Sequence, residues 1–172
     1  AEELISPIVR GVAEATIADL YWRPVYPQLW MKGFFAPLAG RLFPELLPTT
    51  GMAPWSGQRA ALRNLWPTHL PEGFTSDLAI LLHWNDIGAR LRPVAADDWV
   101  NPQRPKPDLM RAECEFLLEH ALLKERITPE EAERFREWFT KAHNLMAEYD
   151  PAQHDPGEFE NELLHKSLSL LP

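Results

Sequence analysis

The chain has 172 residues, of which 45% are hydrophobic and 24% are charged, and its formal net charge is −8 at pH 7. This length can bury the core of one domain, and the apolar share excludes a wholly disordered chain. The acidic excess argues against a general binder of nucleic acid, and the lone cysteine, Cys114, cannot form an internal disulfide. No apolar run reaches the ~20 residues that span a bilayer, and no secretory leader is seen. We therefore expect a soluble cytoplasmic protein without a transmembrane segment.

Charge, proline and tryptophan are distributed unevenly along the chain. Residues 1–107 carry ten acidic and ten basic side chains, thirteen of the 17 prolines and six of the seven tryptophans. Residues 108–172 carry fifteen acidic and seven basic side chains, so the whole net charge lies there. The composition indicates a neutral, Pro/Trp-rich part followed by an acidic, helical part.

The neutral part contains several helix signals broken by proline. Ser6-Pro7 is typical of a helix start, and apolar residues at helical spacing predict a helix that ends near Arg23. Prolines then divide residues 22–56 into pieces of at most two or three turns. A short helix is expected from Ser56 to Trp66.

The end of the neutral part predicts one buried helix and a connector. A helix that begins near residue 75 carries leucines, isoleucines and Trp84 on two adjacent faces, which indicates a largely buried position. Residues 92–107, rich in proline, are expected to form an extended connector. Alternation of apolar and polar residues with period two is found nowhere over a useful length, so no strand is predicted.

The acidic part predicts three helices. The first begins at Pro107-Asp108 and ends near Arg126. Thr128, followed by proline and then by glutamate at the third helical position, begins the second. The short link between them predicts an antiparallel hairpin, and Asp155 caps a final helix. The second helix carries an apolar stripe of Ala132, Phe135, Phe139, Ala142, Met146 and Tyr149.

These elements together predict an all-α fold. We expect residues 1–172 to form a single bundle-like domain of about six or seven helices. It would contain an irregular Pro/Trp-rich segment, a C-terminal helical hairpin and a final helix.

An aromatic stretch in the neutral part suggests a protein-interaction site. Tryptophan, tyrosine and phenylalanine are enriched where protein surfaces meet, and prolines lower the entropy that docking must remove. The alternative is that this stretch wraps around the protein's own helices. The candidate apolar contacts are Trp22, Tyr26, Trp30, Phe34 and Phe35.

The acidic helices suggest a charged rim around such a site. Glu130, Glu133 and Glu137 follow one another at helical spacing and would complement a basic partner. An acidic surface could also occupy the groove of a nucleic-acid-binding protein as a mimic. The plainer alternative is a solvated helix face.

A metal-dependent helical-bundle enzyme is a further alternative. Glu162 and His165 form a Glu-x-x-His pair on one helical face, as di-iron carboxylate bundles require, although the second such pair is missing from the sequence. Neighbouring helices could supply further ligands. The full candidate set is Glu115, Glu119, His120, His143, Glu162 and His165.

The remaining motifs do not complete a catalytic set. Cys114 lies on an apolar helical face, where a thiol is usually inert, and the isolated glycines do not form a phosphate loop. The leading hypothesis is therefore a non-catalytic interaction module without a cofactor. Such an accessory subunit, adaptor or inhibitor would dock on a larger protein or on further copies of itself, without contacting nucleic acid directly.

Overall fold

The computed structural model describes residues 1–19, 29–47, 56–73, 75–95 and 107–172. The chain divides into two compact units. Unit 1 comprises Ala1–Arg23 and Glu45–Asn101, and unit 2 comprises Pro24–Pro44 and Pro102–Pro172. The segment Pro24–Pro44 belongs to the neutral part by composition, yet it falls in the same unit as the acidic helices. The two compact units therefore differ from the two parts that composition indicates.

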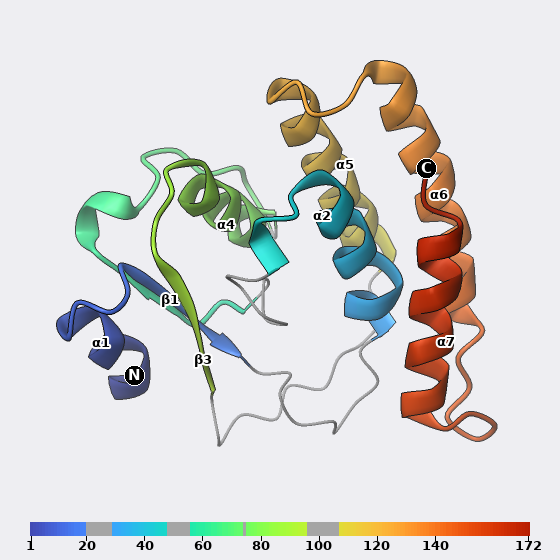
Figure 1. Cartoon of the computed structure of the whole chain (residues 1–172), viewed down its shortest axis with the longest axis horizontal. Coiled ribbons are helices and arrows are strands. Elements are labelled where there is room, and N and C mark those ends of the chain that lie inside the picture. Colours follow the sequence, from blue (N-terminus) through green and yellow to red (C-terminus); the bar gives the residue numbers. More distant parts are fainter. Residues whose placement is uncertain (20–28, 48–55, 74, 96–106) are drawn as a thin grey trace. The chain divides into compact units, whose positions relative to one another are not determined.

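Unit 1 contains a three-stranded mixed sheet, so the all-α prediction is wrong. The strands are β1 (Ala15–Asp19), β2 (Arg59–Ala61) and β3 (Leu91–Ala95), in the order β2-β1-β3. The central strand β1 pairs antiparallel with β2 and parallel with β3, and β1 and β3 run side by side in Figure 1. The fold is mostly helical, with six α-helices in the described part of the chain beside this sheet.

Three local features explain why the strands β1 and β3 were not predicted. Four consecutive residues of β1, from Ala15 to Ala18, are buried, so this strand shows no alternation of apolar and polar residues. The edge strand β3 contains Pro93, a residue that central strands exclude and that edge strands tolerate. Gly11, at φ +72°, separates α1 (Glu2–Val9) from β1, where one long helix was predicted.

The helices of unit 1 are tied to the sheet by partly buried hydrogen bonds. In α1, the carbonyl of Leu4 accepts a hydrogen bond from Thr16 Oγ1 at 2.7 Å. Residues 56–66 form β2 and a 3-10 turn, η2 (Arg63–Leu65), instead of the predicted helix. Arg59 of β2 donates to the carbonyl of Asp77 at the start of α4 (Ser76–Asp86), the buried helix that was predicted correctly.

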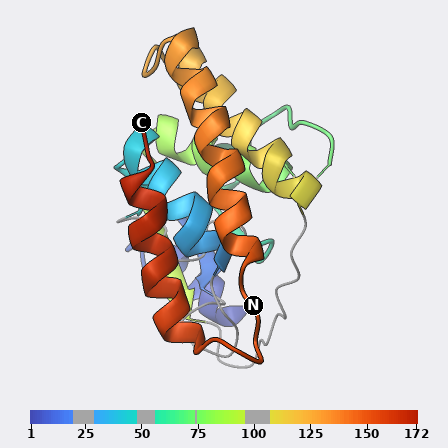
Figure 2. The same ribbon diagram turned by 90° about the vertical axis from the view of Figure 1, so that its right-hand side faces the viewer.

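Unit 2 contains the predicted hairpin. The helices α5 (Pro107–Leu123) and α6 (Pro129–Ala147) are antiparallel, because Glu115 pairs with Arg136 while the earlier Arg111 lies over the ring of Phe139. The expected capping box at Thr128 is present, and α7 (Pro156–Ser169) begins at Asp155 as predicted. Figure 2 shows α6 and α7 lying side by side.

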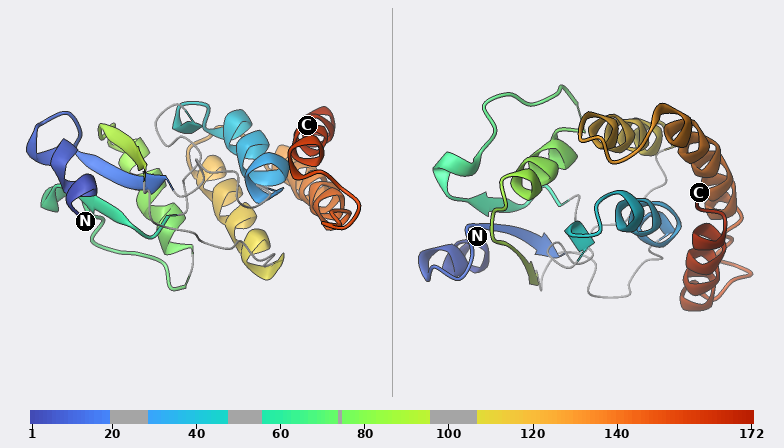
Figure 3. Two further views of the ribbon diagram at one scale, coloured as in Figure 1. Left: turned by 90° about the horizontal axis from the view of Figure 1, so that it is seen from below. Right: turned by 45° about the horizontal axis from the view of Figure 1, so that its top comes forward.

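Residues 31–42 of unit 2 form one continuous helical run, visible in Figure 3. It consists of the π-helix η1 (Met31–Phe35) followed directly by α2 (Ala36–Leu42). Pro37 lies inside this run, although the sequence predicted shorter pieces broken by proline. The wider π turn accommodates it, because the N–H of Ala36 bonds to the carbonyl of Met31 five residues back.

Candidate interaction surface

Of the predicted aromatic contacts that the structure describes, two are buried inside unit 2. Phe34 and Phe35 are both 0% exposed, so neither ring lies at the surface of unit 2, and their role in binding a partner stays a prediction. Phe34 stacks on Trp138 at 6.5 Å between ring centroids and meets Phe139 edge to face at 5.2 Å. Trp30 is half-buried, and Trp22 and Tyr26 lie outside the described residues. This helical run covers the protein's own helices, as the alternative interpretation held.

A buried polar chain fixes the helical run against α6 and α7. Pro37 has no N–H for the carbonyl of Gly33, four residues earlier, which accepts instead from Ser167 Oγ at 2.5 Å. The carbonyl of Ser167 in turn accepts from Trp138 Nε1 at 2.9 Å. These buried hydrogen bonds thereby join η1, α6 and α7 to one another.

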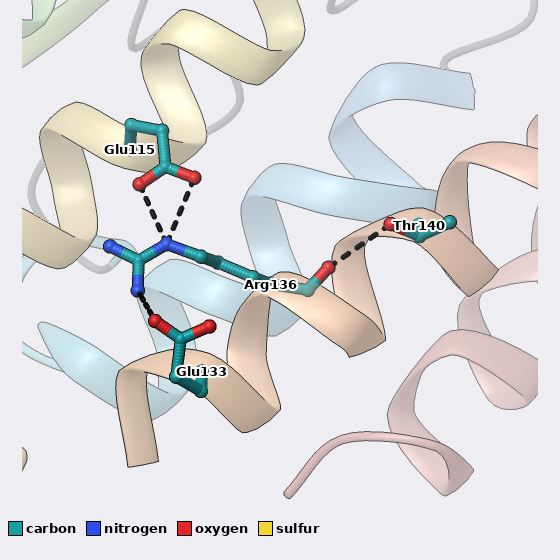
Figure 4. Close-up of polar contacts among 4 residues, drawn as sticks. All are labelled: Glu115, Glu133, Arg136 and Thr140. Carbon is teal, nitrogen blue, oxygen red and sulfur yellow. Dashed lines mark hydrogen bonds and ion pairs between the residues drawn. The ribbon is translucent and has the colours of Figure 1, made fainter. Parts of the chain in front are cut away.

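The predicted charged rim lies on the exposed face of α6. Glu130, Glu133 and Glu137 are all exposed, as an electrostatic contact requires. Figure 4 shows that Glu133 is engaged within the chain, because it accepts from Arg136, whose Nε also donates to both carboxylate oxygens of Glu115. These carboxylates raise the pKa of Arg136, and the largest contribution comes from the hydrogen bond that Arg136 donates to Glu115. The binding role of the rim stays a prediction.

The six candidate metal ligands do not converge. Among the residues that the structure describes, no group of three His, Cys, Asp or Glu side chains could hold a metal ion. Glu115 is engaged with Arg136. Glu162 forms an ion pair with Lys166 at 2.7 Å, and the hydrogen bond from Lys166 lowers the pKa of Glu162. The rings of His120 and His143 pack near Phe43 and Phe139, and Glu119 and His165 are exposed.

Cys114 is buried on α5. Burial raises the pKa of its thiol to about 12, with a smaller contribution from the negative charge of Glu115. The thiolate is therefore scarce at neutral pH, and this side chain is a packing residue instead of a nucleophile.

Large apolar side chains are exposed on the segment after β2. Leu62, Trp66 and Leu70 are 41%, 39% and 45% exposed, and we refer to residues 62–70 as the Trp66 loop. The sequence predicted a helix from Ser56 to Trp66, which covers the first half of this loop, and did not identify the segment as a surface. Pro67 and Pro71, which keep the chain out of a regular helix, were the signal that could have identified it.

The ring of Trp66 is held by its neighbours in unit 1. It packs edge to face against Trp84 of α4, with 5.4 Å between ring centroids and an interplanar angle of 68°. The indole N–H of Trp84 donates to the carbonyl of Leu65 at 3.0 Å, which fixes the backbone just before Trp66. An aromatic side chain is thus presented to solvent in a defined position.

A second exposed apolar surface lies on α1. None of its residues is fully buried, and Ile5 and Val9, one turn apart, are 50% and 78% exposed. They line a shallow groove of about 520 Å³ together with Glu2, Ser6 and Arg10. We refer to these five residues as the α1 groove.

Comparison of the chain with known protein families, curated proteins and solved structures finds no match. Within the described ranges, no helix has both the length and the apolar content needed to cross a membrane.

Proposed function

We propose that this protein is a non-catalytic interaction module that docks on a larger protein through the Trp66 loop. The observation that carries the proposal is the half-exposed, fixed ring of Trp66 between two exposed leucines. Tryptophan is the residue type most enriched among side chains that dominate binding energy. Its place on a loop supported by α4 agrees with the common location of binding residues.

The support beneath the loop favours tight docking. Binding costs free energy for each side chain and loop segment that becomes ordered. Here the contact with Trp84, the bond to Leu65 and the two prolines already restrict the loop before a partner arrives. The partner is expected to offer an apolar pocket for the indole ring, with polar groups around it that face the exposed Arg63 and His69.

The other hypotheses have less support. The metal-dependent enzyme required six side chains that do not converge. The acidic mimic required a continuous negative face, whereas exposed Arg134 and Lys141 interrupt the carboxylates of α6. A cytoplasmic location belongs to the same proposal and is supported by the lone, buried thiol of Cys114.

A capture experiment tests the Trp66 loop. The chain is immobilised, a stoichiometric partner is identified by mass spectrometry, and its affinity is measured with purified proteins by calorimetry. Leu70→Asp is expected to weaken binding at least about tenfold, because it places a charge in the apolar contact.

Leu168→Asp is the matched control, because Leu168 is a leucine of nearly equal exposure, 47% against 45% for Leu70, and it lies in unit 2. It should leave the affinity unchanged. Failure to capture any stoichiometric partner, or equal affinities of Leu70→Asp and the unmodified chain, would contradict the proposal.

A further inference from the structure

The residues of the α1 groove are arranged so that the groove is complementary to a second, reversed copy of itself. Along the helix it presents an acid, an apolar residue, a small polar residue, an apolar residue and a base: Glu2, Ile5, Ser6, Val9 and Arg10. The acid and the base lie eight positions apart, which is about 12 Å along a helix axis. The two ends of the groove therefore carry opposite charges, with apolar side chains between them.

We propose that α1 pairs with α1 of a second copy of this chain, with the two helices antiparallel. A twofold axis near Ser6 would place Glu2 of each copy against Arg10 of the other. Ile5 of each copy would then pack on Val9 of the other, and the small Ser6 at the centre would let the helices approach closely. Such an isologous contact closes on itself and needs only one surface.

The exposure of α1 is the reason to expect an occupant. Val9 is 78% exposed, and α1 has no fully buried residue although its neighbour β1 is buried almost throughout. A helix of eight residues has little stability of its own and depends on packing. Pairing would cover the apolar side of α1 that faces away from the sheet.

Charge complementarity selects an antiparallel second copy over other occupants. A parallel pair would bring Glu2 against Glu2 and Arg10 against Arg10, which is unfavourable at both ends. The antiparallel pair forms two ion pairs and also places the positive N-terminal end of each helix dipole beside the negative C-terminal end of the other. Because the α1 groove contributes only five residues from each copy, against the roughly 20 residues a side of stable complexes, the dimer is expected to be weak.

Sedimentation equilibrium of the whole chain tests this pairing from about 10 μM to about 1 mM, the range that brackets a weak interface. The chain is expected to be a reversible dimer at the upper concentrations. Val9→Glu should raise the dissociation constant at least about tenfold, because it buries a charge at the apolar centre. Val12→Glu, at a residue that is 52% exposed and outside the groove, should not change it.

A charge exchange tests the antiparallel arrangement itself. Glu2→Arg and Arg10→Glu should each weaken the dimer, and the double variant should restore it, because both ion pairs are rebuilt with reversed sign. Glu3→Arg is the matched control, since Glu3 occupies the same first turn but does not line the groove. If only the ion pairs matter, Glu3→Arg should leave the dissociation constant of the dimer unchanged. A weaker dimer would show an effect of the charge on the helix dipole.

Three results would overturn the proposal: a monomer at every concentration, a dimer that Val9→Glu leaves intact, or a double variant as weak as either single variant. None of them bears on the Trp66 loop, because Val9→Glu leaves Leu62, Trp66 and Leu70 unchanged.

Discussion

Gly33 is a point of close approach between the helical run of residues 31–42 and the helices α6 and α7. A Cβ atom at this position would lie 2.7 Å from Cγ of Met146 and 3.0 Å from Cδ2 of Leu163. The carbonyl of the same residue accepts the hydrogen bond from Ser167. Glycine is required here by the space between packed helices, and not by an unusual backbone angle.

Gly33→Ala should destabilise unit 2 by about 1–3 kcal/mol, because the added methyl group overpacks a filled core. The midpoint of urea unfolding, followed by circular dichroism, measures the effect. Gly57→Ala is the control, since a Cβ there would meet no atom within 4 Å. Met146→Ala should relieve part of the overpacking, so equal losses from Gly33→Ala in both backgrounds would contradict this account.

Among the elements, α6 shows how a local signal fixes a helix start. The N–H of Glu131 donates to Oγ1 of Thr128, and a carboxylate oxygen of Glu131 accepts from the N–H of Thr128 at 2.8 Å. This backbone bond lowers the pKa of Glu131 from its ordinary value of 4.5. The ionised form is therefore favoured in the folded chain.

The capping box should contribute to the acid sensitivity of the fold. Because the folded pKa of Glu131 is lowered, its contribution to stability is present above the ordinary value and is lost as the pH falls through the folded value. Glu131→Gln keeps an acceptor without a titrating group, so it should make the stability loss between about pH 6 and about pH 3 shallower. Thermal unfolding across this range measures the loss.

Glu130→Gln removes the same charge from the same turn and leaves the capping box intact, so it is the control for Glu131→Gln. Identical pH profiles of the two variants would contradict the role assigned to the cap.

The elements also show what the sequence could predict. The helices α5, α6 and α7 were correct because caps and apolar stripes are signals within one element. The strand β1 was missed because its pairing is non-local: Ala15 pairs with Ala61 on one side and with Leu91 on the other. The burial of Phe34 could not be predicted for a related reason, since an aromatic composition does not show whether a ring faces the core or the solvent.

At the scale of the whole molecule, each unit has its own buried polar support. In unit 1, Arg59 is held by the carbonyls of Ser56 and Asp77, and burial lowers its pKa to about 10, so the guanidinium remains charged at neutral pH. In unit 2, the corresponding support is the chain of bonds through Ser167. Local opening of the two units can therefore be measured separately.

Hydrogen exchange should report which unit a substitution weakens. Ser167→Ala leaves a buried carbonyl without its donor, which costs about 1–3 kcal/mol, and should accelerate exchange in η1, α6 and α7. Arg59→Lys cannot reproduce the planar set of donors and should accelerate exchange in β1 and β2 instead. Acceleration throughout the chain by either variant would show a single cooperative unit.

The hydrogen bond between Ser167 and Gly33 joins residues 134 positions apart. The first segment of unit 2 is therefore synthesised long before α7, the helix that covers it. Until α6 and α7 have been synthesised, the rings of Phe34 and Phe35 lack their native cover, and the growing chain exposes an apolar segment. Removal of α7 would leave these rings partly uncovered, and an exposed apolar surface of this kind favours aggregation.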